Sequence, residues 1–199
     1  MTIKASDVST EHHGILLRLI ELSNREASCG LSVAVTSPKH SNGVTYVTSM
    51  LCAGLRLMSV PDVMNVQLSV LEKAQNAAEV FALAKQLYPK LDAERDFQTD
   101  PTTLSSPWNY SVESRRRLVR ELCGGSRIVL IDCPPLRQSN RTMIAAGVVD
   151  SVILVVEAGV TTKEDISSAE RKIQASGGNL EGYILNKVRN QPRWFNWDR

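Results

Sequence analysis

One acidic residue follows a strongly apolar segment, in a position typical of a ligand-binding crevice. Residues 128–131 are all apolar, which favours the fully buried strand of a parallel sheet over a half-exposed strand. Asp132 follows them, and the prolines at 134 and 135 prevent a helix from continuing the strand. The carboxyl ends of parallel strands form the crevice in which α/β sheets bind ligands. Asp132 is therefore a candidate site residue, and the alternative is a helix cap or a surface carboxylate.

A second candidate segment runs from Pro38 to Thr45, between a predicted strand and a predicted helix. In the phosphate-binding pattern G-x-x-x-x-G-K-[ST], loop N–H groups and a helix N-terminus bind an anion. Gly43 and Thr45 match the second glycine and the hydroxyl residue, whereas Pro38 replaces the first glycine and Val44 replaces the lysine. The alternative is a plain turn between a strand and a helix.

Both candidates need a sheet that brings a loop and a strand end together. Apolar runs predict strands at 31–36, 63–68, 128–131, 151–156 and 182–185. Apolar faces at helical spacing, together with turn residues, predict helices at 11–27, 44–58, 70–88, 111–123, 139–148 and 163–175. Strands that alternate with helices predict an α/β fold with a mostly parallel sheet, flanked by helices on both faces.

Composition narrows the class of protein. The 199 residues predict a single domain, with a loose start at 1–9 and an aromatic, basic tail at 190–199. A net charge of +2 gives no reason to expect nucleic-acid or membrane binding. Four cysteines without a C-x-x-C pair favour a reducing cytoplasm. No segment is expected to be a signal peptide or a transmembrane helix.

Residues 128–188 resemble the C-terminal half of a bacterial tyrosine kinase, one of the P-loop proteins attached to capsule and exopolysaccharide export machines. The run IVLIDCPP is similar to their Walker B segment, and residues 148–188 follow their pattern of strand, Thr-capped helix and strand ending in Leu-Asn. Residues 32–55 resemble the Walker A strand, loop and helix. The resemblance covers residues 11–190 and implies a P-loop NTPase-like sheet related to the deviant-Walker ATPases.

The resemblance implies a site for ATP or ADP with Mg²⁺. Thr45 matches the hydroxyl that ligates Mg²⁺, and Asp132 matches the Walker B carboxylate that holds the metal through water. Asp132 is also the residue expected to be catalytic if the protein is active.

Further nucleotide contacts are implied at the loop and at the last strand. Asn42, Gly43 and Val44 lie in the loop that meets the phosphates. Asn186 sits where the family contacts the adenine base, and Lys39 occupies the place of the signature lysine of the partitioning ATPases.

Three catalytic features of the family are nevertheless missing. The P-loop lysine is Val44, and no acid occurs in 63–69, where an Asp-x-Asp motif is expected. The tail contains no tyrosine cluster, which removes the usual autophosphorylation target. Of the Glu-x-x-Arg-x-x-Arg motif for ring assembly, at best Arg18 is present. The scaffold is kept while the catalytic groups are lost.

These departures leave the question of enzymatic activity open, with a non-catalytic role preferred. The first hypothesis is a pseudo-kinase that acts as an interaction subunit in exopolysaccharide synthesis or export. The second is an active ATPase or tyrosine kinase in which Lys39 replaces the missing lysine. A third, a DNA-binding scaffold that uses the arginines at 115–117 and 120, is opposed by the balanced net charge, so no nucleic-acid partner is expected.

Partners and location follow from the resemblance. The family's kinase domains dock on the cytoplasmic end of a membrane-embedded polysaccharide co-polymerase or export protein. We therefore expect a cytoplasmic chain that is held at the inner membrane through such a partner. The helix at 11–27 and the aromatic residues at 194–197 are the expected docking surfaces, and a homo-oligomer is a further option.

Overall fold

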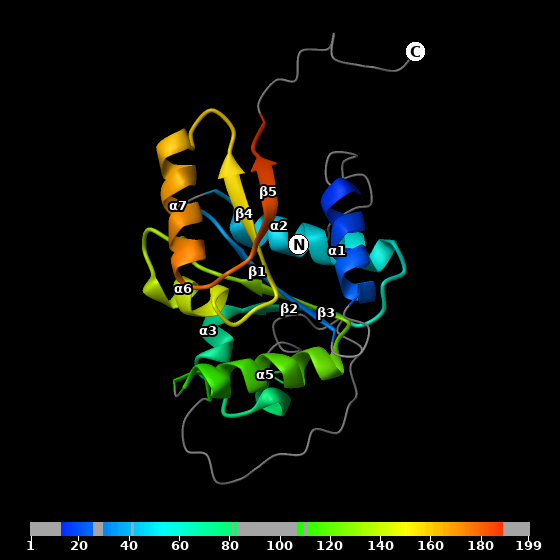
Figure 1. Cartoon of the computed structure of the whole chain (residues 1–199). Coiled ribbons are helices and arrows are strands. Elements are labelled where there is room, and N and C mark those ends of the chain that lie inside the picture. Colours follow the sequence, from blue (N-terminus) through cyan, green and yellow to red (C-terminus); the bar gives the residue numbers. More distant parts are fainter. Residues whose placement is uncertain are drawn as a thin grey trace.

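The protein is built on a five-stranded sheet in which every strand pair is parallel (Figure 1). The computed structural model describes residues 13–25, 30–40, 42–80, 82, 107–109 and 111–188. The strands are β1 (Leu31–Thr36), β2 (Val63–Gln67), β3 (Ile128–Asp132), β4 (Ser151–Glu157) and β5 (Leu180–Asn186). Their order in the sheet is β2-β3-β1-β4-β5, which makes β2 and β5 the edges. The predicted α/β fold with a parallel sheet is confirmed.

Helices cover both faces of the sheet (Figure 1). On one face lie α1 (His13–Arg25) and α2 (Val44–Leu57), whose buried side chains form the α2-side core with that face of the strands. The other face is covered by α3 (Leu68–Leu71), η3 (Pro107–Asn109), α5 (Val112–Gly125), α6 (Asn140–Ala146) and α7 (Lys163–Ala175). Their buried side chains form the α5-side core.

The apolar run of β3 follows from this two-sided burial. All five residues of β3 are buried. Ile128 and Leu130 belong to the α2-side core, whereas Val129 and Ile131 belong to the α5-side core. Because successive side chains of a strand point to opposite faces, a strand covered on both sides must be apolar at every position. The strand continues to Asp132, one residue beyond its predicted end, so the carboxylate stands at the carboxyl edge of the sheet.

The helix predicted at 70–88 is wrong in its first part. The short helix α3 ends at Leu71, the chain turns over 72–76, and a helix resumes at 77–80. Asn76 explains the new start, because its side-chain oxygen accepts a hydrogen bond from the Glu79 N–H at 2.9 Å. The Glu79 carboxylate in turn accepts from the Gln75 N–H at 2.6 Å. These local caps compete with continuation of the helix through 72–76.

Other predicted boundaries are close to the observed ones. Ser111 caps α5, and Thr162 caps α7 in a capping box with Asp165. The last strand is longer than predicted, since β5 covers Leu180–Asn186. The predictions for 1–9, for the end of the helix at 70–88 and for the tail at 190–199 lie outside the described residues. In the described part of the chain, no helix combines the length and the apolar character needed to cross a membrane.

Candidate functional site

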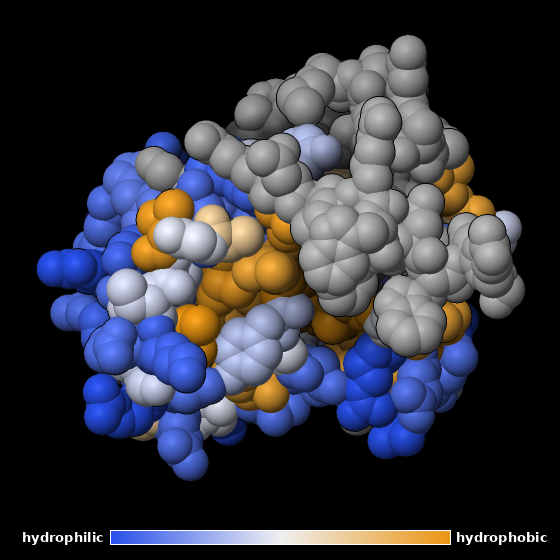
Figure 2. Space-filling model, turned by 90° about the horizontal axis from the view of Figure 1, so that it is seen from above, coloured by the Kyte–Doolittle hydropathy of each residue, from blue (hydrophilic) through white to orange (hydrophobic). Residues whose placement is uncertain are grey.

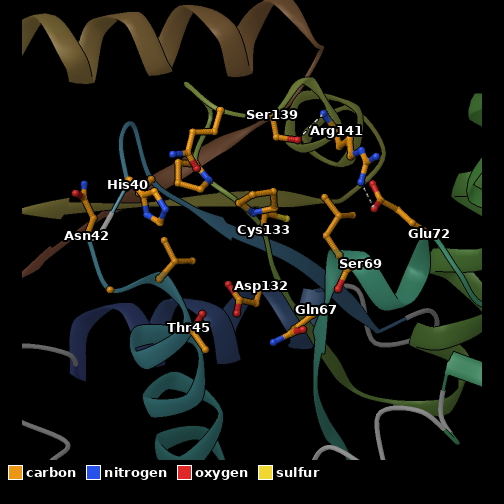
Figure 3. A pocket seen from close by; sticks show the side chains of 17 residues that line it. His40, Asn42, Thr45, Gln67, Ser69, Glu72, Asp132, Cys133, Ser139 and Arg141 are labelled. Carbon is orange, nitrogen blue, oxygen red and sulfur yellow. Dashed lines mark hydrogen bonds and ion pairs between the residues drawn. The ribbon is translucent and has the colours of Figure 1, made fainter.

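A cavity of about 820 Å³ opens at the carboxyl ends of β2 and β3, beside the loop that follows β1 (Figure 3). It is lined by Ser37, His40, residues 42–45, residues 67–69, Glu72, residues 132–135, Gln138, Ser139 and Arg141. The lining thus comes from the loop before α2, the end of β2 with α3, and the segment between β3 and α6. The volume falls within the range of small-molecule sites.

Thr45 and Asp132 meet at the floor of this cavity (Figure 3). Asp132 ends β3 and is only 9% exposed. Burial raises the pKa of Asp132, and a hydrogen bond with the Thr45 side chain opposes part of the rise. A hydroxyl and a carboxylate side by side offer the hard oxygen atoms that Mg²⁺ prefers. The structure therefore brings the two predicted metal ligands together, and metal binding itself stays a prediction.

The start of α2 offers backbone donors to the cavity. Gly43 precedes the helix with φ 82°, a left-handed conformation that glycine adopts without strain. Glycine has no side chain to cap the helix, so the N–H groups of the first turn are left for a ligand or for water. The positive end of the helix dipole lies at the same place. This geometry suits an anionic group, as the loop pattern predicts.

Hydrogen bonds of Asn42 and Asn186 hold the loop before α2 in place. The side chain of Asn42 is buried, and its Nδ2 donates to the Val155 carbonyl at 3.2 Å and to Thr161 Oγ1 at 3.3 Å. Asn186 Nδ2 donates to the carbonyl of Asn42 at 2.8 Å, and its Oδ1 accepts from the Lys187 N–H at 2.9 Å. The structure thus places Asn186 against the loop backbone and outside the residues that line the cavity. Its predicted contact with adenine remains untested.

The lysine position of the loop is filled by a core residue. Val44 is 9% exposed and packs in the α2-side core. Lys39 does not replace it here, since its Nζ lies 2.5 Å from Asp165 Oδ2 in the first turn of α7. Lys39 is also absent from the residues that line the cavity. Of the predicted site residues, the structure gathers 42–45 and Asp132 around the cavity and leaves Lys39 and Asn186 outside it.

The sequence analysis missed several polar residues of the cavity, among them Gln67, Ser69, Glu72 and Arg141. Gln67 ends β2 and stands in register with Asp132, and Ser69 follows it in α3. They occupy the segment in which the acidic motif was expected, with uncharged side chains. The register of β2 beside β3 is the signal that could have found Gln67. Glu72 and Arg141 line the same cavity and form an ion pair, with 3.0 Å between Oε2 and Nη1. No local pattern links these two, because they are distant in sequence.

Comparison with known proteins gives one match in sequence. No protein-family model matches the chain. The tyrosine-protein kinase YwqD of Bacillus subtilis (strain 168) is 30% identical to it over 83 residues. This match covers 42% of the chain and 32% of the kinase, so the chain spans about a third of that relative's length.

Solved structures share the fold over most of the chain. The kinase domain of the Escherichia coli tyrosine kinase ETK superposes with a TM-score of 0.62 at 18% identity, covering 91% of this chain and 74% of that one. The cobyrinic acid a,c-diamide synthase of Mycobacterium smegmatis, solved with a bound ATP analogue and magnesium, has a TM-score of 0.52 at 17% identity and covers 78% and 74%. The chain therefore has the P-loop fold of the bacterial tyrosine-kinase domains and is similar in sequence to one of these kinases over part of its length.

Proposed function

We propose that the protein is a non-catalytic relative of the bacterial tyrosine kinases, which serves as a cytoplasmic interaction subunit in exopolysaccharide or capsule biosynthesis or export. Its partner would be a membrane-embedded polysaccharide co-polymerase. The observation that carries the proposal is Val44, a buried apolar side chain at the lysine position of a loop whose fold is otherwise kept. A scaffold that keeps its shape and loses its charge is suited to binding rather than to phosphoryl transfer.

The size of the missing interaction supports this view. A unit charge about 4 Å from a phosphate is worth on the order of 4 kcal/mol at an effective dielectric constant near 20. If screening removes half of this, nucleotide affinity falls by roughly tenfold to a hundredfold. Phosphoryl transfer depends mainly on positioning and on electrostatic stabilisation of the transition state. The loss of the lysine therefore affects catalysis more than it affects the fold.

The second acidic motif is also replaced by neutral groups. Gln67 ends β2 and Ser69 lies in α3 directly after it, in the segment where carboxylates would be expected to hold the metal or to act as a base. Asp132 is then the only acid at the strand ends that line the cavity, and Glu72 is the other carboxylate among the described lining residues.

The residues present fit a magnesium nucleotide in part. Thr45 and Asp132 would hold the Mg²⁺, and the N-terminus of α2 would receive the phosphates. The metal would supply the positive charge that the loop lacks. We therefore propose weak binding of ATP or ADP with Mg²⁺, without rapid turnover.

Protein interaction needs an accessible apolar surface, and the chain has one at its sheet edge. Tyr183 and Leu185 of the edge strand β5 are 47% and 54% exposed, and Leu17 of α1 is 56% exposed. Figure 2 shows apolar side chains near the centre of one face, with hydrophilic side chains to the left of them and below them. Exposed apolar areas of this kind are typical of contact surfaces.

Phosphate release from Mg-ATP by the purified protein tests the proposal. The matched control is Asp132→Asn, which keeps the size of the side chain and removes its charge. We expect the wild-type protein to release phosphate no faster than this variant. A wild-type turnover well above that of Asp132→Asn would overturn the proposal.

The alternative, an active enzyme that uses Lys39, requires the ion pair with Asp165 to open. Lys39→Ala should then abolish turnover and nucleotide binding, whereas Lys163→Ala, an exposed lysine at the start of α7, should not. Under our proposal, neither substitution changes nucleotide affinity.

A further inference from the structure

An ion pair between α6 and the residue that follows α3 lies at the edge of the cavity. Arg141 Nη1 of α6 lies 3.0 Å from Oε2 of Glu72, which follows α3. The arginine side chain is 70% exposed, whereas that of Glu72 is only 15% exposed. Figure 3 shows the pair across the cavity from His40 and Asn42, with Asp132 and Thr45 between the two sides.

Arg141 differs in charge from the other side chains that line the cavity. Among the described residues that line the cavity, Arg141 is the only side chain with a permanent positive charge. The same lining contains two carboxylates, Asp132 and Glu72, which repel an anionic ligand. With the lysine position filled by Val44, the N-terminus of α2 supplies only a partial positive charge to an anion. Among the described lining side chains, Arg141 is therefore the one that can give a phosphate a full positive charge in addition to that of a bound Mg²⁺.

We propose that Arg141 is the phosphate-binding cation of this cavity, and that Glu72 competes with the ligand for it. The ligand is a nucleoside diphosphate or triphosphate, so the inference rests on the weak nucleotide binding proposed above. Arg141 would replace, from the α6 side, the charge that the loop has lost at Val44.

The structure gives Arg141 the freedom that this role requires. The arginine side chain is 70% exposed, so the guanidinium keeps its contact with water when it is drawn away from Glu72. Among the described residues, Glu72 is the only recorded side-chain partner of the Arg141 guanidinium. Its remaining N–H groups can meet two phosphate oxygens at once, the bidentate geometry that suits arginine better than lysine.

Because Glu72 and the phosphate compete for Arg141, substitutions of Glu72 and of Arg141 should change nucleotide affinity in opposite directions. Removing the charge of Glu72 frees Arg141 and lowers the repulsion of the phosphate. Removing Arg141 takes away the cation and leaves two carboxylates. If the pair served only to hold α3 against α6, either substitution would break the same contact and act in the same direction.

Calorimetric titration with Mg-ADP of the full chain tests the inference. We expect Arg141→Gln to weaken binding about tenfold, because a hydrogen bond to a charged group is lost. Glu72→Gln should strengthen binding severalfold, and this gain should be largely lost in the double variant. The matched control is Arg137→Gln, on the same segment, since Arg137 is absent from the lining of this cavity and should leave affinity unchanged.

Three results would overturn the inference. Arg141→Gln could bind as tightly as Arg137→Gln, the two substitutions of the pair could shift affinity in the same direction, or no variant could bind at millimolar Mg-ADP. Thermal melts of each variant establish that the chain is folded. The proposed non-catalytic role is judged separately, by phosphate release against Asp132→Asn, so the two ideas can fail independently.

Discussion

Lys39 and Asp165 form an ion pair with 2.5 Å between Nζ and Oδ2, which joins the loop after β1 to the first turn of α7. Asp165 is also the acid of the α7 capping box, and its Oδ2 accepts from the N–H of Thr162 at 3.0 Å and from its hydroxyl at 2.8 Å. The lysine that resembles a signature lysine in sequence is thus part of a helix cap in the structure. This contact directs Lys39 toward α7 and fixes the loop beside the cavity.

The first prediction concerns the pKa of Asp165. Hydrogen bonds from Lys39 and from Thr162 lower it from its ordinary 3.8 to about 2. Because the pKa is lower in the folded protein, this carboxylate stabilises the fold above pH 3.8, and the contribution is lost as the pH falls toward 2. In Lys39→Ala, the pKa of Asp165 should rise toward its ordinary value.

Carboxyl ¹³C NMR across an acid titration measures this shift directly. Lys163→Ala, which removes a nearby exposed lysine, is the control and should leave the pKa of Asp165 low. An unchanged pKa in Lys39→Ala would show that the ion pair is not maintained in solution.

Restoring the lysine of the loop is the second prediction. Val44→Lys should strengthen binding of Mg-ADP by roughly tenfold to a hundredfold, since the cation returns beside the phosphates. It should also lower the free energy of unfolding by about 1–3 kcal/mol, because a buried valine leaves the α2-side core. Calorimetry and urea denaturation measure the two effects.

Val44→Met separates charge from size in this experiment. Methionine is also long and unbranched, but it carries no charge, so it should not strengthen nucleotide binding. Equal affinity in the lysine and methionine variants would show that the missing charge is not what limits binding.

A third prediction concerns the tight contact between Gly43 and Asn186. A Cβ atom on Gly43 would lie 2.4 Å from Asn186 Nδ2, and the residue has φ 82°. Gly43→Ala should therefore destabilise the protein by about 1–3 kcal/mol, through the clash and the strained backbone. Gly14→Ala is the control, because nothing lies within 4 Å of its added methyl group in α1. There alanine should be neutral or stabilising by up to about 1 kcal/mol. Similar unfolding midpoints for the two variants in urea would contradict this account.

Local patterns predicted the elements of this fold better than they predicted its contacts. The strand at 31–36, the apolar run of β3 and the helix α7 were found because each is set by its own sequence: β1 and β3 by nearly continuous apolar residues, and α7 by its Thr162 cap. The break at 72–76 was missed because the Asn76 cap competes with an apolar spacing that also fits one long helix.

The site residues likewise fall into those that a local sequence pattern marks and those that depend on contacts between distant segments. Asp132 and Thr45 were predicted because a strand end and a loop pattern mark them, and the parallel sheet places both at one cavity. The ion pairs of Lys39 with Asp165 and of Glu72 with Arg141 join distant segments. Such pairs depend on how helices pack on the sheet, which no local spacing encodes.

The last prediction concerns Asn65, a polar residue buried within β2. It is 2% exposed, and neither its Nδ2 nor its Oδ1 has a hydrogen-bond partner among the described residues. A buried amide without partners costs about 1–3 kcal/mol, so Asn65→Val should stabilise the protein by about 1–2 kcal/mol in urea denaturation. The control is Thr48→Val, a buried position whose hydroxyl donates to the Val44 carbonyl at 2.9 Å, where no gain is expected. A loss of stability in Asn65→Val would show that its amide is hydrogen-bonded in solution, and that this polar group contributes to the packing of β2 against α2.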